Sequence, residues 1–150
     1  MKTQNISTKI EKKTRKSIRV NRKIKKEKII ELLDDGSKEF RVAKLILKNI
    51  FGKNKKIRTV KKISKQTLIP TNLDREIKEK LNCYLNNKTH KYEGIKILEN
   101  ILEDEIIGFC KTNKIKIGTK EKRNDLIEAV EKLQPRTKYA LAKSLEKIFP

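Results

Sequence analysis

The sequence predicts an all-α protein, in which small helical domains follow a disordered basic N-terminal arm. Two observations support this fold class: apolar residues recur at helical spacing along most of the chain after residue 26, and no segment shows a convincing strand pattern. The 150 residues suffice for one ordinary domain or for two small ones with a tail. We expect an arm of residues 1–26, a helical subdomain of residues 27–87 and a second helical subdomain of residues 91–150.

The predicted arm is defined by its charge. Residues 1–26 hold 11 basic residues and a single acid, Glu11. A block of like charges with few apolar residues repels itself, so we expect it to be disordered. Its Ser/Thr content would also suit an organellar transit peptide, although Lys rather than Arg dominates it. The stretch lacks the apolar core of a secretory signal, and no apolar run approaches the ~20 residues of a membrane span.

Two helices are predicted after the arm. The apolar residues of 29–33 predict a short first helix, and Gly36 is suited to the left-handed cap position that ends it. Ser37 is a good N-cap for the second helix. Ala43, Ile46, Leu47 and Ile50 fall at helical spacing in that helix, which Gly52 ends.

Residues 58–82 predict a helical hairpin that is similar to a helix-turn-helix. Pro70 closes its turn, and Thr71 or Asn72 caps the helix that follows. In a true helix-turn-helix the second helix would enter the major groove of DNA. The usual turn glycine is replaced by Thr67-Leu68, so an ordinary hairpin is the preferred interpretation.

The polar run Asn86–Gly94 is the expected domain boundary. After it, apolar residues at helical spacing from Leu98 to Phe109 predict a helix with its acids turned outward. A further helix is predicted around residues 126–133, and Pro135 separates it from a final helix that contains Leu141, Leu145, Ile148 and Phe149.

The segment between the first two of these helices alternates apolar and basic residues. Ile115 and Ile117 alternate with Lys114 and Lys116, so an extended strand can bury its isoleucines and present its lysines. Backbone N–H groups near Gly118 and the start of the next helix are ready donors for a phosphate.

The stretch "LEDEIIGFCKTNKIKIGTKEKRNDLIEAVEKL", within residues 98–133, resembles the SAP-like and Rho N-terminal-like helix–extended loop–helix module. In this resemblance Ile106 and Cys110 are the inward residues of the first helix, and Leu126-Ile127 open the second. The loop is about three residues longer than the usual SAP pattern, and Lys114 stands where the turn glycine is expected. The resemblance implies a nucleic-acid contact made by the basic loop.

Composition predicts the class of partner. The chain carries 40 Lys and Arg against 19 Asp and Glu, a formal net charge of +21. Residues 1–70 account for +17 of it and residues 71–150 for +4. A polyanionic partner suits such an excess, because each neutralised phosphate releases a condensed counterion. We therefore predict nucleic acid as the partner, with DNA favoured over RNA, and no membrane.

The predicted function is a non-enzymatic DNA-binding protein of weak sequence specificity, of the packaging, genome-organising or architectural kind. The alternatives are an RNA-bound structural component, such as a ribosomal or ribosome-associated protein, and an adaptor whose residues 71–150 dock a protein partner. Homo-oligomerisation is also open. The residues predicted to contact nucleic acid lie in the arm and in two basic loops: Arg15, Lys16, Arg19, Arg22, Lys23, Lys25, Lys26, Lys53, Lys55, Lys56, Arg58, Lys61, Lys62, Lys114, Lys116, Thr119, Lys120, Lys122 and Arg123.

The sequence predicts neither an enzyme nor a metal or cofactor site. Cys83, Cys110 and the single histidine, His90, do not have the spacing of a zinc site. The two cysteines are expected to be reduced thiols in an intracellular compartment, with nucleoid, nucleus, virion and organelle all open.

Two acidic patterns resemble parts of nuclease centres. The letters Asp74-Arg-Glu76-Ile-Lys78 occur in some metal-dependent nucleases, whose carboxylates come from a strand-rich core that is not expected here. Glu103-Asp104-Glu105 occupies consecutive helix positions, which point to different faces and do not gather a metal.

Overall fold

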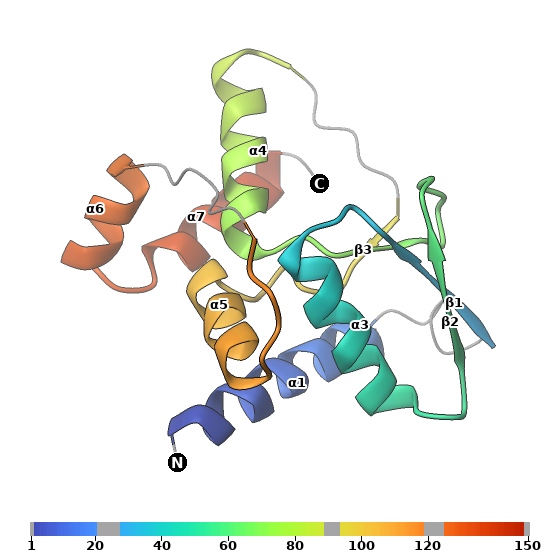
Figure 1. Cartoon of the computed structure of the whole chain (residues 1–150). Helices are drawn as coiled ribbons and strands as arrows, with labels where there is room; N and C mark the ends of the chain where they lie inside the picture. Colours follow the sequence, from blue (N-terminus) through green and yellow to red (C-terminus); the bar gives the residue numbers. More distant parts are fainter. Residues whose placement is uncertain (1, 21–27, 89–93, 119–124, 149–150) are drawn as a thin grey trace.

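The computed structural model of the chain describes residues 2–20, 28–88, 94–118 and 125–148. Within them lies a four-stranded parallel sheet in the order β2-β1-β3-β4 (Figure 1). The strands are β1 (Ile29–Leu33), β2 (Lys56–Val60), β3 (Leu68–Ile69) and β4 (Ile95–Lys96). The helices around them are α1 (Lys2–Val20), α3 (Lys38–Phe51), α4 (Leu73–Leu85), α5 (Glu103–Thr112), α6 (Asp125–Leu133) and α7 (Thr137–Ile148).

The predicted all-α class is therefore wrong, and the protein is α/β. The decisive segment is β1, which the sequence analysis placed in a short helix. Its burial alternates, with Ile30 and Leu32 at 3% and 0% exposure between more exposed neighbours. A short apolar run cannot be assigned to helix or strand by periodicity alone. Here β1 pairs with β2 in parallel, from Ile29 opposite Lys56 to Leu33 opposite Val60, and this pairing shows that the segment is a strand.

The other strands were missed for related reasons. Where the structure has β2, the sequence predicts a basic loop and the start of a helix, because Lys56 and Arg58 occupy exposed positions of the strand. The strands β3 and β4 have two residues each, too few for a period to be visible. Because residues 58–60 and 68–69 are strands, the predicted helix-turn-helix-like hairpin of residues 58–82 is also wrong, and only α4 remains of it.

The predicted disordered arm is corrected over residues 2–20, which form α1. Ile10, Thr14 and Ile18 recur every four residues and are buried at 0%, 0% and 6% exposure, so one stripe of this basic helix faces the core. The helix packs mainly against α5. Residues 21–26 of the predicted arm lie outside the described residues.

The predicted caps and the helices of the C-terminal half are largely confirmed. Ser37 caps α3 by accepting a hydrogen bond from the Phe40 amide, and Asn72 caps α4 by accepting one from the Arg75 amide. The helices α6 and α7 are found where they were expected. The helix expected from Leu98 instead begins at Glu103, because the preceding turn uses the Ile101 carbonyl to accept from the Leu73 amide at 2.9 Å.

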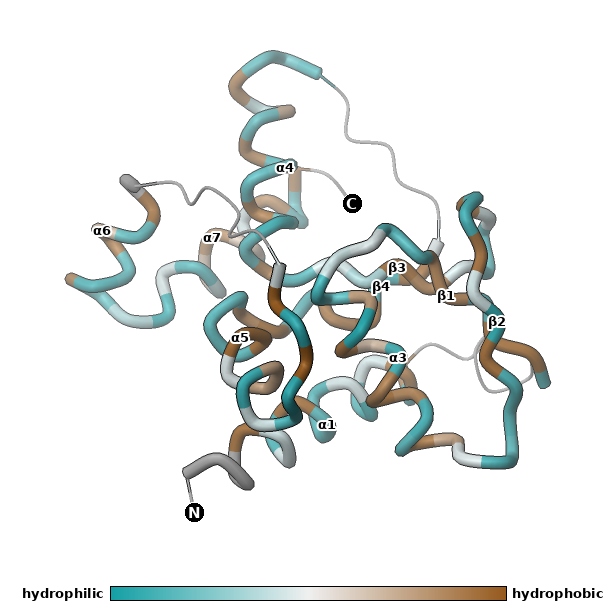
Figure 2. The backbone as a smooth tube through the Cα atoms, viewed as in Figure 1, coloured by the Kyte–Doolittle hydropathy of each residue, from teal (hydrophilic) through white to brown (hydrophobic). Residues whose placement is uncertain are grey.

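The main apolar core lies between the sheet and the helices α1, α3 and α5 (Figure 2). A smaller cluster joins α4 to α7 through Leu73, Ile77 and Leu145. The main cluster contains buried residues from each of the predicted segments 1–26, 27–87 and 91–150, from Ile10 to Cys110. The division into these domains stays a prediction. None of the described helices combines the length and apolar character that crossing a membrane requires.

Truncation of the central strand tests this fold. We expect Leu32→Ala to lower the free energy of unfolding by about 2–5 kcal/mol, because Leu32 is fully buried in the core. Ile29→Ala on the same strand is the matched control, since Ile29 is 52% exposed and its loss should cost less than about 1 kcal/mol. Chemical denaturation measures both, and equal costs would contradict the position of β1.

Candidate functional site

The carboxyl ends of β1 and β3 form the candidate site. The two strands are neighbours in the sheet, but β1 leads through α3 to β2 on one side, whereas β3 pairs with β4 on the other. The loops that leave β1 and β3 therefore diverge. In open parallel sheets, ligands bind outside the carboxyl ends of the strands at such a point.

The loop after β1 is an ordered acidic turn. Gly36 has a φ of 74°, which a glycine adopts without strain. The Gly36 and Ser37 amides donate to the carboxylates of Asp34 and Asp35 at 3.1 and 3.0 Å. The hydrogen bond from Lys61, together with that from the Gly36 amide, lowers the pKa of Asp34 from its ordinary value. Asp34 is therefore ionised at neutral pH, and its charge is paired with that of Lys61.

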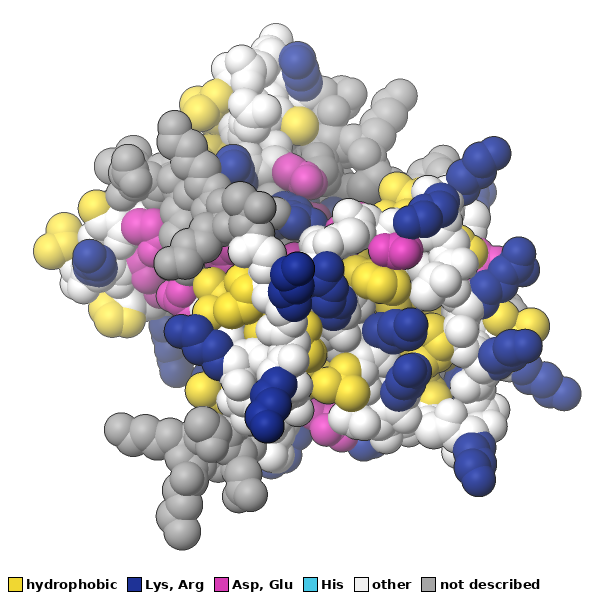
Figure 3. Space-filling view, in the orientation of Figure 1, with side chains coloured by type: hydrophobic (Ala, Val, Ile, Leu, Met, Phe, Trp, Pro, Cys, Tyr) yellow, Lys and Arg dark blue, Asp and Glu magenta, His cyan; other side chains and the backbone are white. Residues whose placement is uncertain are grey.

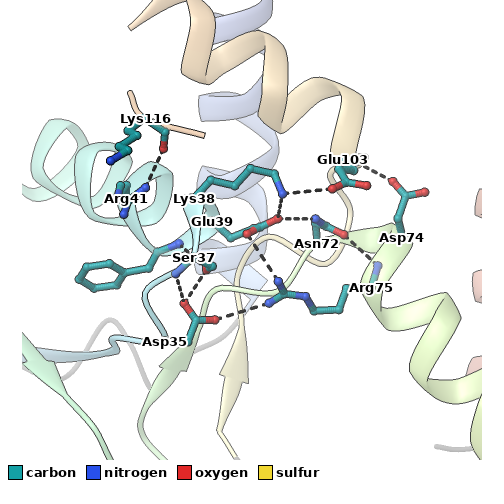
Figure 4. A network of polar contacts seen from close by, with 11 residues as sticks. Asp35, Ser37, Lys38, Glu39, Arg41, Asn72, Asp74, Arg75, Glu103 and Lys116 are labelled. Atoms are coloured by element: carbon teal, nitrogen blue, oxygen red, sulfur yellow. Dashed lines mark hydrogen bonds and ion pairs between the residues drawn. The ribbon is translucent and has the colours of Figure 1, made fainter. Parts of the chain in front are cut away.

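A buried ion cluster lies behind the turn (Figure 4). The Nζ atom of Lys38 is 3.0 Å from Glu39 Oε1 and 3.1 Å from Glu103 Oε1, and the three residues are 4%, 0% and 5% exposed. Burial by itself would lower the pKa of Lys38, but the hydrogen bonds to the two carboxylates outweigh it and raise the pKa above 10.5. Lys38 thus stays charged and joins α3 to α5.

The loop after β3 is tied to the same cluster. Asn72 donates from Nδ2 to Glu39 Oε1 at 2.8 Å while its Oδ1 caps α4. The guanidinium of Arg75 lies 3.5 Å from Asp35 Oδ2 and 3.7 Å from Glu39 Oε2. Asn72 and Arg75 therefore hold the two diverging loops together.

The N-termini of α3, α4 and α5 converge here, and the chain's own polar groups cap them. The Glu103 amide at the start of α5 donates to Asp74 Oδ2 at 2.6 Å, and the capping residues of α3 and α4 are Ser37 and Asn72. Helix N-termini attract anions. Here side-chain oxygens of the chain already accept from these amides, and the nearby carboxylates of Asp34 and Asp35 are paired with Lys61 and Arg75.

A second candidate surface is basic and covers α3, the edge strand β2 and the segment of residues 113–118 (Figure 3). Lys and Arg side chains gather there, whereas acidic side chains are more frequent near α6 and α7. As predicted, Ile115 and Ile117 pack partly buried against the main core, while Lys114 and Lys116 are exposed. The Arg41 guanidinium donates to the Lys116 carbonyl at 2.7 Å and so attaches this segment to α3.

The predicted contact residues fall on several parts of this structure. Arg15, Lys16 and Arg19 are exposed on α1. The second group borders or belongs to β2. Lys55 is half-buried over the Phe51 ring. The other residues of this group are exposed: Lys53, Lys56, Arg58, Lys61 and Lys62. The remaining predicted residues lie outside the described residues: Arg22, Lys23, Lys25, Lys26, Thr119, Lys120, Lys122 and Arg123.

Sequence reasoning missed three basic residues of this surface. Arg41, Lys44 and Lys48 recur at i, i+3 and i+7, so they share one face of α3. The opposite face carries the buried residues of the helix, among them Val42 and Ile46. The signal was present in the sequence, because the apolar stripe that predicted the helix also fixes its outward face.

The acidic patterns considered as nuclease centres have structural partners. Asp74 caps α5 and pairs with Lys138 at 2.7 Å, and Glu76 is buried and pairs with Lys96. Glu103 and Glu105 point to different partners, Lys38 and Lys13, as expected for consecutive helix positions. Within the described residues, no three His, Cys, Asp or Glu side chains come together as metal ligands.

Comparison with known proteins identifies the fold. No protein-family model and no curated protein matches the chain. Among solved structures it is similar to the U34-tRNA thiolase NcsA from Methanococcus maripaludis, with its [4Fe-4S] cluster. The TM-score is 0.74 at 14% sequence identity, over 97% of this chain and 79% of that one. At this identity the likeness establishes the fold alone.

This likeness overturns several predictions. The resemblance to a SAP-like or Rho N-terminal-like module over residues 98–133 is wrong, since α5 packs against α1 and α3 in an α/β core while α6 packs against α7. The predicted non-enzymatic DNA-binding function is contradicted as well, because the fold is similar to that of a tRNA thiolase. The prediction that the chain is no enzyme is contradicted in the same way, and the preference for DNA has no support.

The residues of this chain do not fit an iron–sulfur cluster like that of the similar structure. Such clusters are held by cysteine thiolates, four in the usual case. The chain has two cysteines, Cys83 on α4 and Cys110 on α5, and Cys110 is fully buried in the main core. Burial raises the pKa of the Cys110 thiol, which opposes formation of the thiolate. The two cysteines of this chain therefore do not provide the ligands of such a cluster.

Removal of Lys38 tests the ion cluster. We expect Lys38→Met to lower the free energy of unfolding by about 3–5 kcal/mol, because it leaves Glu39 and Glu103 buried without their cation. Lys48→Met on the exposed face of the same helix is the control and should change stability by less than about 0.5 kcal/mol. Urea denaturation of both variants gives the comparison, and equal effects would rule out the proposed role of Lys38.

The same variant has a pH signature. The pKa of Lys38 is higher in the folded than in the unfolded protein, so its contribution is complete below 10.5 and is lost as the pH rises through the folded value. Stability of Lys38→Met should therefore fall less steeply than that of the parent protein above pH 10.5. Denaturation between pH 8 and 12 measures this, and parallel curves would contradict the raised pKa.

Proposed function

We propose that this protein binds structured RNA of the tRNA class and takes part in its chemical modification. The observation that carries the proposal is the combination of a strongly basic surface with a fold similar to that of a tRNA thiolase. A net charge of +21 favours a polyanion as partner, and the fold favours a folded RNA over a DNA duplex.

The predicted contact residues enter this proposal as phosphate contacts to RNA. The exposed residues around β2 and on the segment of residues 113–118 belong to one basic surface, which supports a common role. Arg15, Lys16 and Arg19 on α1 would extend the contact area. Side chains that contact phosphates position a nucleic acid without reading its sequence, so we expect recognition of RNA shape.

The candidate site at the carboxyl ends of β1 and β3 is the proposed place of the chemistry. It lies next to the basic surface, because α3 begins at the Asp34–Ser37 turn and carries basic residues along its length. An intracellular, reducing compartment suits both an RNA substrate and the two cysteine thiols. The reaction itself would be carried out without a cluster held by this chain's cysteines.

Binding to matched nucleic acids tests the partner. We expect purified protein to bind unfractionated tRNA at least about tenfold more tightly than a DNA duplex with the same number of phosphates, a difference of about 1.4 kcal/mol. Both affinities should fall linearly with the logarithm of salt concentration. Filter binding between 50 and 300 mM salt gives the affinities and slopes. Equal or tighter binding to DNA would contradict the proposal.

Nucleoside composition tests the chemistry. Total tRNA from cells that carry the gene and from cells without it would be digested and compared by mass spectrometry. We expect one modified nucleoside to disappear with the gene and to return when the gene is restored. Identical nucleoside profiles, despite RNA binding by the purified protein, would remove modification from the proposed function.

A further inference from the structure

We propose that a row of basic side chains on the outward face of α3, called the rail below, binds the sugar–phosphate backbone of a double-helical RNA stem. The inference rests on the proposed function and specifies which form of RNA the basic surface takes. The rail consists of Arg41, Lys44 and Lys48 on α3, extended by Lys116 at one end and Lys55 at the other.

The geometry of α3 supports a linear contact. Residues at i, i+3 and i+7 lie in one row along a helix, and at 1.5 Å per residue Arg41 and Lys48 are separated by roughly 10 Å along the axis. The contact between Arg41 and the Lys116 carbonyl places the exposed Lys116 beside the start of the row. Lys55 lies over the ring of Phe51, the last residue of the helix, so the row from Arg41 to this end measures roughly 15 Å along the axis.

The charges in the row are of one sign. The only acid of α3 is Glu39, which is fully buried and pairs with Lys38 on the inner side. Each strand of a DNA duplex carries about one phosphate charge per 3.4 Å of its axis, so along a strand of comparable charge density a row of cations roughly 15 Å long matches a backbone segment of several phosphates.

The aromatic residues next to the rail favour a duplex over a single strand. Recognition of a single strand depends on aromatic faces that stack on unpaired bases. Phe40 and Phe51 on α3 are partly buried against the main core. The Nζ atom of Lys44 lies 6.0 Å from the Phe40 ring centroid, and that of Lys55 lies 5.3 Å from the Phe51 ring centroid. These rings orient lysines toward the surface and are poorly placed to stack on bases.

The direction of α3 also assigns an orientation to the stem. The helix begins beside the carboxyl ends of β1 and β3 and runs away from them to Phe51. A stem lying along the rail therefore points one end toward the Asp34–Ser37 turn, and unpaired nucleotides beyond that end would approach the candidate site.

Neutralisation of the rail tests the first part of the inference. The triple variant Arg41→Ser, Lys44→Ser, Lys48→Ser should bind a stem-loop RNA about 100-fold more weakly at 100 mM salt, and its salt slope should decrease by about two to three. The matched control removes three exposed lysines from α6 and α7, by Lys132→Ser, Lys143→Ser and Lys147→Ser, and should lose less than about threefold. Circular dichroism and thermal melting verify that both variants are folded.

The outcomes separate this inference from the proposed function. Failure of the parent protein to bind any RNA would remove the proposed function and the rail with it. Tight binding that the rail variant and the control reduce equally would overturn the rail alone. A single-stranded RNA of the same length that competes as well as the stem-loop would overturn the preference for a duplex.

Site-directed cross-linking tests the orientation. In a Cys83→Ser background, Asp34→Cys and Asn54→Cys place one reactive thiol at either end of α3, while Cys110 remains buried. A photoactivatable azide attached at position 34 should cross-link to the loop of the RNA, and one attached at position 54 to the far end of the stem. Cross-links with the two ends exchanged, or spread evenly over the RNA, would overturn the orientation.

Discussion

The pairing of Lys38 with Glu39 and Glu103 is the interaction on which the rest of the structure depends. Lysine at the first turn of a helix opposes the helix dipole, so its position at the start of α3 is explained by its partners rather than by the helix. The two carboxylates come from α3 and α5, and Asn72 adds the start of α4 through Glu39. One buried ammonium thus fixes the elements that frame the carboxyl ends of β1 and β3, and it positions α3, whose other face carries the basic surface.

The sequence predicted the local signals of this fold better than its class. Ser37 and Asn72 have the cap roles expected of them, because those roles depend on the residue itself and a few neighbours. Gly36 has the expected left-handed conformation, but it follows a strand and does not end a helix. The strands depend on partners far along the chain. Ile30 and Leu32 show a strand only when β2 and β3 are known to lie beside them, and β3 and β4 are too short to produce any pattern.

The candidate site was only partly predictable for the same reason. The basic loops can be predicted from their charge. The row of Arg41, Lys44 and Lys48 lies on the exposed face of α3, whereas the helix is predicted from the apolar residues of its buried face. The buried partners of Lys38 come from residues 39 and 103, and no local rule joins them. The prediction of a disordered arm is wrong over residues 2–20, because high charge does not by itself exclude folding. In α1 the stripe of Ile10, Thr14 and Ile18 is sufficient to anchor a basic helix.

The charges on β2 have a consequence for solubility. This strand is the outer strand of the sheet, so one side of its backbone lacks a neighbouring strand within the described fold. Exposed strand edges invite pairing with another chain, and lysine or arginine on such an edge opposes it by charge repulsion. Lys56 and Arg58 are exposed on this strand. The residues that we propose as phosphate contacts therefore also oppose sheet-to-sheet pairing between copies of the protein, and a bound RNA that neutralised them would have to shield the edge itself.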